Sequence, residues 1–181
     1  CALPISTCAR VGCMPSKLLI AAAEAAHAIE MAPAFGVHSS KPVIDGKAVM
    51  ARVKSERDRF AGFVVEAVDE LPEGDKIRGY AKFLDTNRIQ IDDHTIITAK
   101  RFVIATGSRP SYPGVFNNFG DRLIINDDVF DWDDLPESVA VFGPGVIGLE
   151  IGQALHRLGV KVKLFGVGGA IGPLTDPVVK D

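Results

Sequence analysis

Two long stretches in the first half of the chain are typical of α-helices. The first, from Ser16 to about Ala32, is rich in alanine and leucine, which favour helix most strongly, and Pro33 and Gly36 end it. The second runs from about Gly46 to Leu71 and repeats apolar residues at helical spacing. Its repeating apolar positions are Val49, Val53, Phe60, Phe63, Val64 and Ala67.

The hydrophobic pattern then changes to the short alternating runs of strands. Residues 76–84, 88–91 and 95–97 predict three short strands of a meander, separated by turn residues. The run RFVIA at 101–105 predicts a further strand, buried in a sheet. Residues 108–136, which carry prolines and asparagines, are typical of a connection between domains rather than of a helix or strand.

The last part of the chain alternates strand, helix and strand. Ser138 to Phe142 and Lys161 to Phe165 are short apolar strands, and a helix from Val146 to Leu158 lies between them. This order is that of a βαβ unit, so the chain as a whole is expected to be of the α/β class.

Composition narrows the classes of function. The 181 residues carry a net charge of −3 with no basic block, which argues against a nucleic acid or an anionic membrane as partner. We find no apolar run of about 18 residues and no secretory signal, so a soluble protein is expected. Three cysteines do not make a disulfide scaffold, and a cytoplasmic location is therefore predicted.

The cysteine spacing points to local chemistry. Cys8 and Cys13 have four residues between them and stand just before the first predicted helix, so they can close a small disulfide ring if Gly12 relaxes the turn. The positive end of the helix that starts near Pro15 is expected to favour a thiolate at Cys13. The alternatives are two inert buried cysteines, or a zinc site, which lacks a second pair of ligands.

A glycine turn follows the strand that ends at Phe142. Gly143, Gly145 and Gly148 form a GxGxxG pattern between strand and helix, which favours a dinucleotide whose pyrophosphate lies on the helix N-terminus. The alternative is a tight turn and nothing more. The next strand ends at Gly166 without an acid or an arginine, so NAD is preferred and NADP stays open.

A run of acids between 127 and 134 raises the question of a metal. It lacks the glycine and the final glutamate of a calcium-binding EF-hand loop, so a solvated turn and no metal are expected. The acids are Asp127, Asp128, Asp131, Asp133 and Asp134.

The segment from Cys8 to Lys17, CARVGCMPSK, resembles the active-site motif of the pyridine nucleotide-disulfide oxidoreductases. The resemblance implies that Cys8 exchanges with substrate and that Cys13 lies against the flavin ring. It also implies that Lys17 lies near the flavin and pairs with Glu150, so these four residues are the expected catalytic set. Within the family the chain most resembles the dihydrolipoamide dehydrogenases, with mercuric or glutathione reductase as alternatives.

The same resemblance assigns cofactors. Lys17, Thr106 and Gly107 match flavin-side positions, and the three glycines of the turn match the nicotinamide domain, so FAD and NAD are expected. Residues 1–112 would form a partial FAD-binding domain, 113–136 the interdomain connection, and 137–181 the first part of a Rossmann-like NAD(P)-binding domain. The implied partner is a small or protein-bound dithiol, with a homodimer as the parent assembly and no nucleic acid or membrane.

The chain also departs from the family. Ile5 and Ser6 stand where glycines are usual, Arg10 stands where asparagine is common, and residues 1–6 show no likeness to the family. The first flavin-binding βαβ unit and the C-terminal dimerisation domain are not found in these 181 residues. The alternative to a flavin-dependent enzyme is therefore a truncated piece with no activity of its own.

Overall fold

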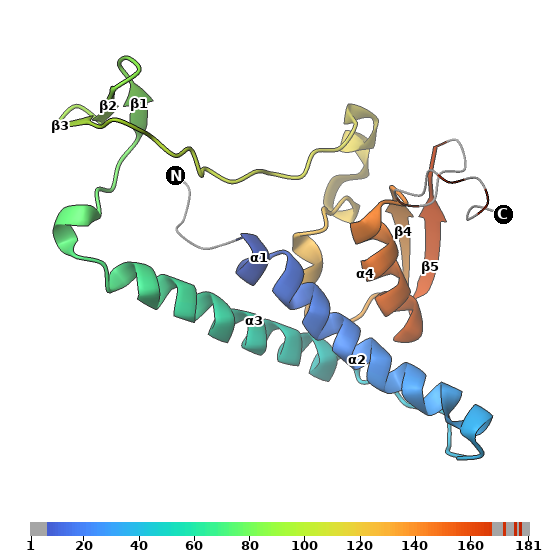
Figure 1. The fold of residues 1–181 in the computed structure, drawn as a ribbon. Coiled ribbons are helices and arrows are strands. Elements are labelled where there is room, and N and C mark those ends of the chain that lie inside the picture. The colour runs from blue at the N-terminus through green and yellow to red at the C-terminus, as the bar shows by residue number, and fades with distance from the viewer. Residues whose placement is uncertain (1–6, 168–171, 173–175, 177, 179–181) are drawn as a thin grey trace.

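The computed structural model describes residues 7–167, 172, 176 and 178. Three helices form its body: α2 (Cys13–Met31), α3 (Gly46–Asp69) and α4 (Val146–Arg157), with the single-turn α1 (Thr7–Arg10) ahead of them (Figure 1). Both predicted N-terminal helices are confirmed. The first begins three residues earlier than expected, at Cys13, which moves this cysteine into the helix.

The start of α3 has a side-chain cap. The Asp45 carboxylate accepts a hydrogen bond from the Ala48 amide at 3.0 Å, which satisfies one of the free amides of the first turn. At the start of α2 the N-cap is Gly12, which has no side chain for this purpose. Pro15 in the first turn costs no intrahelical hydrogen bond, because the first four amides have no partner within the helix.

The predicted meander is confirmed as a three-stranded antiparallel sheet in the order β1 (Ala81–Phe83), β2 (Arg88–Ile91) and β3 (Thr95–Thr98). Its first strand is shorter than the predicted 76–84. A 3₁₀ turn, η2 (Glu73–Asp75), and Gly79, whose φ is +153°, keep the chain out of extended pairing until Ala81.

The prediction of a buried strand at 101–105 is wrong. The segment forms no strand in the described part of the chain, and Val103 and Ile104 are 91% and 74% exposed. Figure 1 shows it as an extended trace between the meander and the connection. Strand formation requires a hydrogen-bonding neighbour, and no other described segment lies alongside to provide one.

The predicted connection contains more local structure than expected. Residues 108–136 contain two 3₁₀ segments, η3 (Gly114–Arg122) and η4 (Asp128–Asp131). Within η4, Val129 and Phe130 are buried, and Phe130 is only 1% exposed. A large aromatic side chain gains free energy on burial, so this short segment is part of the core despite its acidic surroundings.

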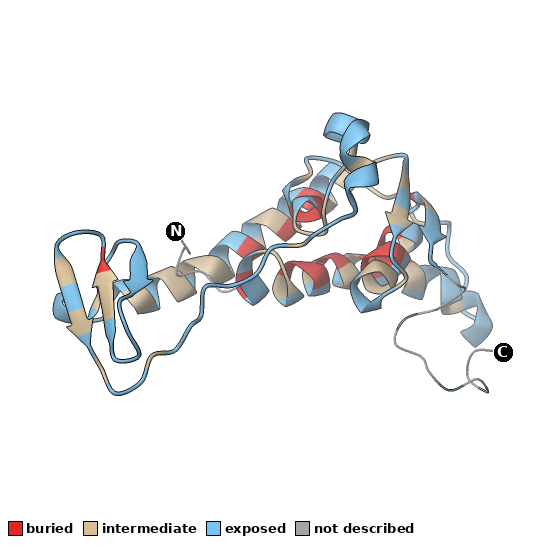
Figure 2. Cartoon of the chain, turned by 90° about the horizontal axis from the view of Figure 1, so that it is seen from above, coloured by how far each residue is buried: buried red, intermediate tan, exposed pale blue. Residues whose placement is uncertain are grey.

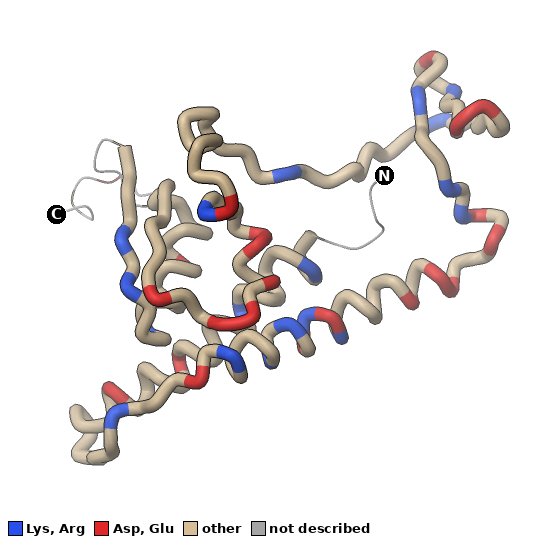
Figure 3. Tube along the Cα trace, turned by 180° about the vertical axis from the view of Figure 1, so that it is seen from behind, with Lys and Arg blue, Asp and Glu red and all other residues tan. Residues whose placement is uncertain are grey.

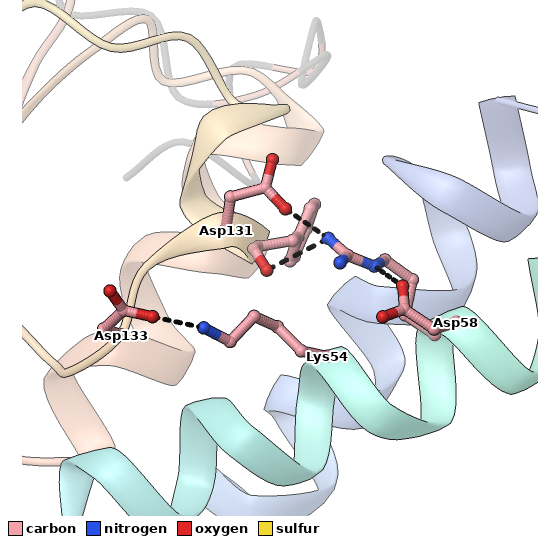
Figure 4. A network of polar contacts seen from close by, with 6 residues as sticks. Lys54, Asp58, Asp131 and Asp133 are labelled. Carbon is pink, nitrogen blue, oxygen red and sulfur yellow. Dashed lines mark hydrogen bonds and ion pairs between the residues drawn. The ribbon is translucent and has the colours of Figure 1, made fainter.

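The acids of this connection lie mostly at the surface, as the solvated-turn prediction expects, and the Asp131 and Asp133 side chains are 65% and 96% exposed. Arg57 on α3 is buried and donates from Nη1 to the Phe130 carbonyl at 3.1 Å and to Asp131 at 2.6 Å (Figure 4). Lys54, one turn earlier on α3, pairs with Asp133 at 2.5 Å. Figure 3 marks the basic positions along α3 and the acidic positions of this loop. The two ion pairs form because α3 lies beside this loop. The sequence alone did not predict that contact.

The C-terminal βαβ unit is confirmed. Strands β4 (Ser138–Phe142) and β5 (Lys161–Phe165) are parallel, with α4 connecting them. Helix α2 packs against both α3 and α4, and the buried positions gather where these helices meet η4 (Figure 2). The cluster consists of Leu19, Ala23, Met50, Val53, Val129, Phe130, Ile151, Ala154, Leu155, Leu158 and Val160.

The span Thr7–Phe35 meets the length and composition of a membrane-crossing helix, contrary to the expectation that no such run exists. Its alanines raise its apolar character. In this fold Leu19 and Ala23 of the same helix lie fully inside the contact with α3 and α4. Only 17% of the apolar window is buried, and a single span of this kind near the N-terminus is weak evidence for a membrane segment.

Candidate functional site

The two motif cysteines lie together at the junction of α1 and α2. Both are free, exposed thiols, and they are near enough to share a hydrogen bond. A Cβ at Gly12 would lie 3.0 Å from the Thr7 carbonyl oxygen and 3.2 Å from the Cα of Cys8. Any larger residue would therefore push α1 away from the start of α2. Glycine is required here because α1 and α2 approach closely. Its φ of −124° is not the reason, because other residues also adopt that value.

The protonation of Cys13 differs from the prediction. The hydrogen bond with the Cys8 thiol and the charge at Cys8 raise the pKa of Cys13, while Lys17 acts in the opposite direction. In the dithiol form Cys13 therefore keeps its proton to higher pH than an isolated cysteine, so the neighbouring Cys8 opposes the predicted thiolate in this form. The physical reason is that a second negative charge beside a first is unfavourable.

A short polar network joins the start of α2 to α4. The Lys17 ammonium lies 2.8 Å from Oε1 of Glu150, and the Ser16 hydroxyl lies 2.9 Å from the same oxygen. The Ser16 hydroxyl is also 3.1 Å from the Cys13 carbonyl oxygen. The approach of Lys17 to Glu150, 133 residues later in the chain, is therefore confirmed. Ser16 was not among the predicted site residues, and its place in the motif beside Lys17 is the signal in the sequence that points to it.

The electrostatics of Glu150 follow from these contacts. The hydrogen bond from Lys17 is the largest influence and lowers the pKa of Glu150, and the one from Ser16 also lowers it. Partial burial acts in the opposite direction but is outweighed. Glu150 is thus held as a carboxylate on the side of α4 that faces the cysteine turn.

The glycine turn has the geometry expected of a dinucleotide site. Gly143 has a φ of +110°, a conformation that favours glycine, and its amide donates to the Phe165 carbonyl at 2.9 Å. A Cβ at Gly148 would lie 2.2 Å from the Gly143 carbonyl oxygen, so helix and turn touch there. Gly145 is the N-cap of α4 and has open space where a Cβ would be. A phosphate can approach the helix N-terminus at this point, and the residues fit a nicotinamide dinucleotide.

The structure does not bring Thr106 and Gly107 to the cysteine pair. Both are exposed on the extended segment between the meander and η3, with Gly107 at a φ of +75°. No hydrogen bond or ion pair in the described ranges links them to α1 or α2, and Figures 1 and 3 show the segment apart from these helices. Of the predicted flavin-side residues, only Lys17 is at the cysteine turn. The described residues therefore do not assemble a complete flavin cradle.

A metal centre finds no support. Within residues 7–167 and the three further described positions, no group of three or more histidines, cysteines or acids is suitably placed to hold an ion. The third cysteine, Cys1, lies outside the described residues.

Comparison with known proteins gives a consistent result. The sequence model of the family described as "Pyridine nucleotide-disulphide oxidoreductase" matches residues 5–181, so the match includes Ile5 and Ser6 despite their unusual identity. The mercuric reductase of Lysinibacillus sphaericus is 31% identical over 164 residues, which are 88% of this chain and 29% of that protein. The dihydrolipoyl dehydrogenase of Thermus scotoductus is 35% identical over 162 residues, 87% of this chain and 34% of that protein.

A solved structure shares the fold. The Cu(II) complex of the HOCl-induced flavoprotein disulfide reductase RclA from Escherichia coli superimposes with a TM-score of 0.77 at 20% identity, over 99% of this chain and 38% of that one. The chain thus spans about a third of the length of these relatives.

Proposed function

The chain belongs to the pyridine nucleotide-disulphide oxidoreductase family, and on this premise we propose that it supplies the redox-active cysteine pair and the nicotinamide-dinucleotide turn of a flavin-dependent disulfide oxidoreductase. One observation carries the proposal. The exposed thiols of Cys8 and Cys13 lie at the junction of α1 and α2. Ser16 and Lys17 in the first turns of α2 contact Glu150 on α4, the helix that follows the glycine turn. The two halves of an electron-transfer site are therefore joined in one packed unit.

The proposed chemistry is thiol–disulfide exchange. The Cys8 thiolate attacks one sulfur of a disulfide substrate, forms a mixed disulfide and releases the first substrate thiolate, which takes up a proton. Cys13 then loses its proton and attacks the Cys8 sulfur. This step breaks the mixed disulfide, releases the second substrate thiol and leaves a Cys8–Cys13 disulfide. Two electrons pass from the pair to the substrate, and a dithiol substrate reverses the sequence.

The surrounding residues support this order of events. Cys13 keeps its proton while Cys8 is a thiol neighbour, so it acts as the second, resolving thiol. Loss of the Cys8 thiol to a mixed disulfide removes the two largest causes of the raised pKa of Cys13, and Lys17 then favours its thiolate. Cys8 and Lys17 together would thus allow Cys13 to become a reactive thiolate only after the first exchange.

Two cofactors belong to this proposal. Gly143, Gly145 and Gly148 would hold the pyrophosphate of NAD, which would supply or accept the hydride, with NADP left open by the residues after β5. FAD would lie beside Cys13 and Lys17, but Thr106 and Gly107 lie elsewhere, so its cradle requires more than the described residues.

The substrate class is a small or protein-bound dithiol, as in a dihydrolipoyl dehydrogenase. The mercuric reductases among the relatives support a second candidate, reduction of a thiol-bound mercuric ion. We further propose the division 1–112, 113–136 and 137–181, with the last part a Rossmann-like unit, and a cytoplasmic homodimer as the working form of the protein.

Trapping of the mixed disulfide tests the exchange roles. The reduced chain is mixed with a chromogenic aromatic disulfide, and the products are identified by peptide mass spectrometry. Trypsin separates the two thiols because Arg10 lies between them. We expect wild type to release two equivalents of thiol and form the Cys8–Cys13 disulfide, while Cys13→Ser stops at a mixed disulfide on Cys8. A stable adduct on Cys13 in wild type, with Cys8 unreacted, would reject the assignment.

A further inference from the structure

Helices α2 and α4 have a second polar contact besides the one at the cysteine turn. Nη1 of Arg157, in the last turn of α4, pairs with Oε1 of Glu24 on α2. The Arg157 side chain is 21% exposed and that of Glu24 is 57% exposed. This pair lies outside both motifs and is not used by the exchange chemistry.

The spacing of the two contacts is the same on both helices. Glu24 follows Lys17 by seven residues, and Arg157 follows Glu150 by seven residues. Seven residues are about two helical turns, or about 10.5 Å along the axis. The two helices therefore run in the same direction, and their ion pairs lie on one shared face.

The charges of the two contacts are arranged in opposite order. At the cysteine end the cation is on α2 and the anion on α4, and at the other end the order is reversed. A slip by two turns in one direction would bring Lys17 toward Arg157, and a slip in the other would bring Glu24 toward Glu150. Both misaligned arrangements place like charges together, so the pattern disfavours slipping either way.

The apolar contact between the two ion pairs is of mixed size. Ala23 on α2 and Ala154 on α4 lie in the buried cluster beside the larger Leu19, Ile151 and Leu155. Only the charged pairs become repulsive when the helices slip, so they add a specificity that apolar side chains do not have.

We propose that Glu24 and Arg157 are positioning residues, which hold α4 in register on α2 so that Glu150 stays on Ser16 and Lys17 beside the redox-active cysteines. Neither residue touches the reacting sulfurs. The importance of this register for the reaction rests on the proposed function. The register itself can be measured on the chain without any turnover.

The decisive variant is Glu24→Arg, because its direct and indirect effects on Glu150 have opposite signs. The new positive charge, acting alone about 10.5 Å away, would lower the pKa of Glu150. Loss of register would remove the Lys17 and Ser16 hydrogen bonds and raise it. The pKa is read from the carboxyl-carbon NMR titration of Glu150 at about 0.15 M salt, where distant charges are largely screened.

We expect Glu24→Arg to raise the pKa of Glu150 and to speed acylation of the Lys17 amine by up to about fivefold, as expected for loss of one ion pair. The double variant Glu24→Arg/Arg157→Glu should return both readouts to wild-type values. Glu24→Gln, which only removes a charge, should give a smaller change in the same direction and guards against misfolding of the reversed variants.

Glu137→Arg is the matched control. It reverses the charge of one member of the ion pair between Glu137 and Lys161, two exposed side chains that lie outside α2. It should leave both readouts unchanged. An unshifted or lowered pKa of Glu150 in folded Glu24→Arg, or failure of the double variant to restore it, would overturn the proposal. Either result leaves the trapping experiment on Cys8 and Cys13 unaffected, so the two claims fail separately.

Discussion

The cysteine turn and the segment around Thr106 carry motifs of the same family, but their surroundings differ. Lys17 lies on a helix that packs on α3 and α4, and its carboxylate partner is in place. Thr106 and Gly107 follow an apolar run whose Val103 side chain is 91% exposed. A motif forms a site only where the elements that pack around it are present, and of these two segments the condition holds for the redox turn.

The first prediction compares the stability lost on truncating a side chain in the packed region and one on the extended segment. Phe130→Ala removes a fully buried ring from the junction of η4 with the helices, and it should cost about 3 to 5 kcal/mol of unfolding free energy. Val103→Ala, at an exposed position, should change stability by less than about 0.5 kcal/mol. Urea denaturation followed by circular dichroism measures both. Equal losses would show that the extended segment is packed in solution.

The second prediction concerns the glycine turn, which is closely packed at Gly148 and has open space at Gly145. Gly148→Ala places a Cβ 2.2 Å from the Gly143 carbonyl oxygen and should cost about 1 to 3 kcal/mol, despite the better helix propensity of alanine. Gly145→Ala meets open space and should keep the wild-type melting temperature. Differential scanning calorimetry compares the pair, and a destabilised Gly145→Ala would contradict the open geometry.

The smallest predicted effect is a pH dependence of the contact between the two helices. The pKa of Glu150 is lowered in the folded chain, so its pairing with Lys17 contributes stability above the ordinary glutamate pKa. That contribution is lost as pH falls through the lowered folded value. Because Lys17 is largely exposed, we expect under about 1 kcal/mol. Glu150→Gln should therefore be less stable than wild type at pH 7 and equal to it at the acid end of a denaturation series.

The sequence by itself determined the local features of this protein. Helix propensity predicted α2 and α3, glycine spacing predicted the turn before α4, and the motif around Cys8 and Cys13 indicated a redox pair. Each of these is encoded by residues close together in the chain, so short-range pattern and backbone preference are sufficient.

Only the tertiary structure decided which of these features meet. The hydrogen bond of Arg57 to the Phe130 carbonyl, its ion pair with Asp131 and the contact of Ser16 with Glu150 all join residues more than 70 positions apart. The apolar run at 101–105 shows the reverse case, since its pattern is that of a strand but none of the described strands pairs with it. Pairing and packing free energies depend on what lies alongside, and one-dimensional patterns do not contain that information.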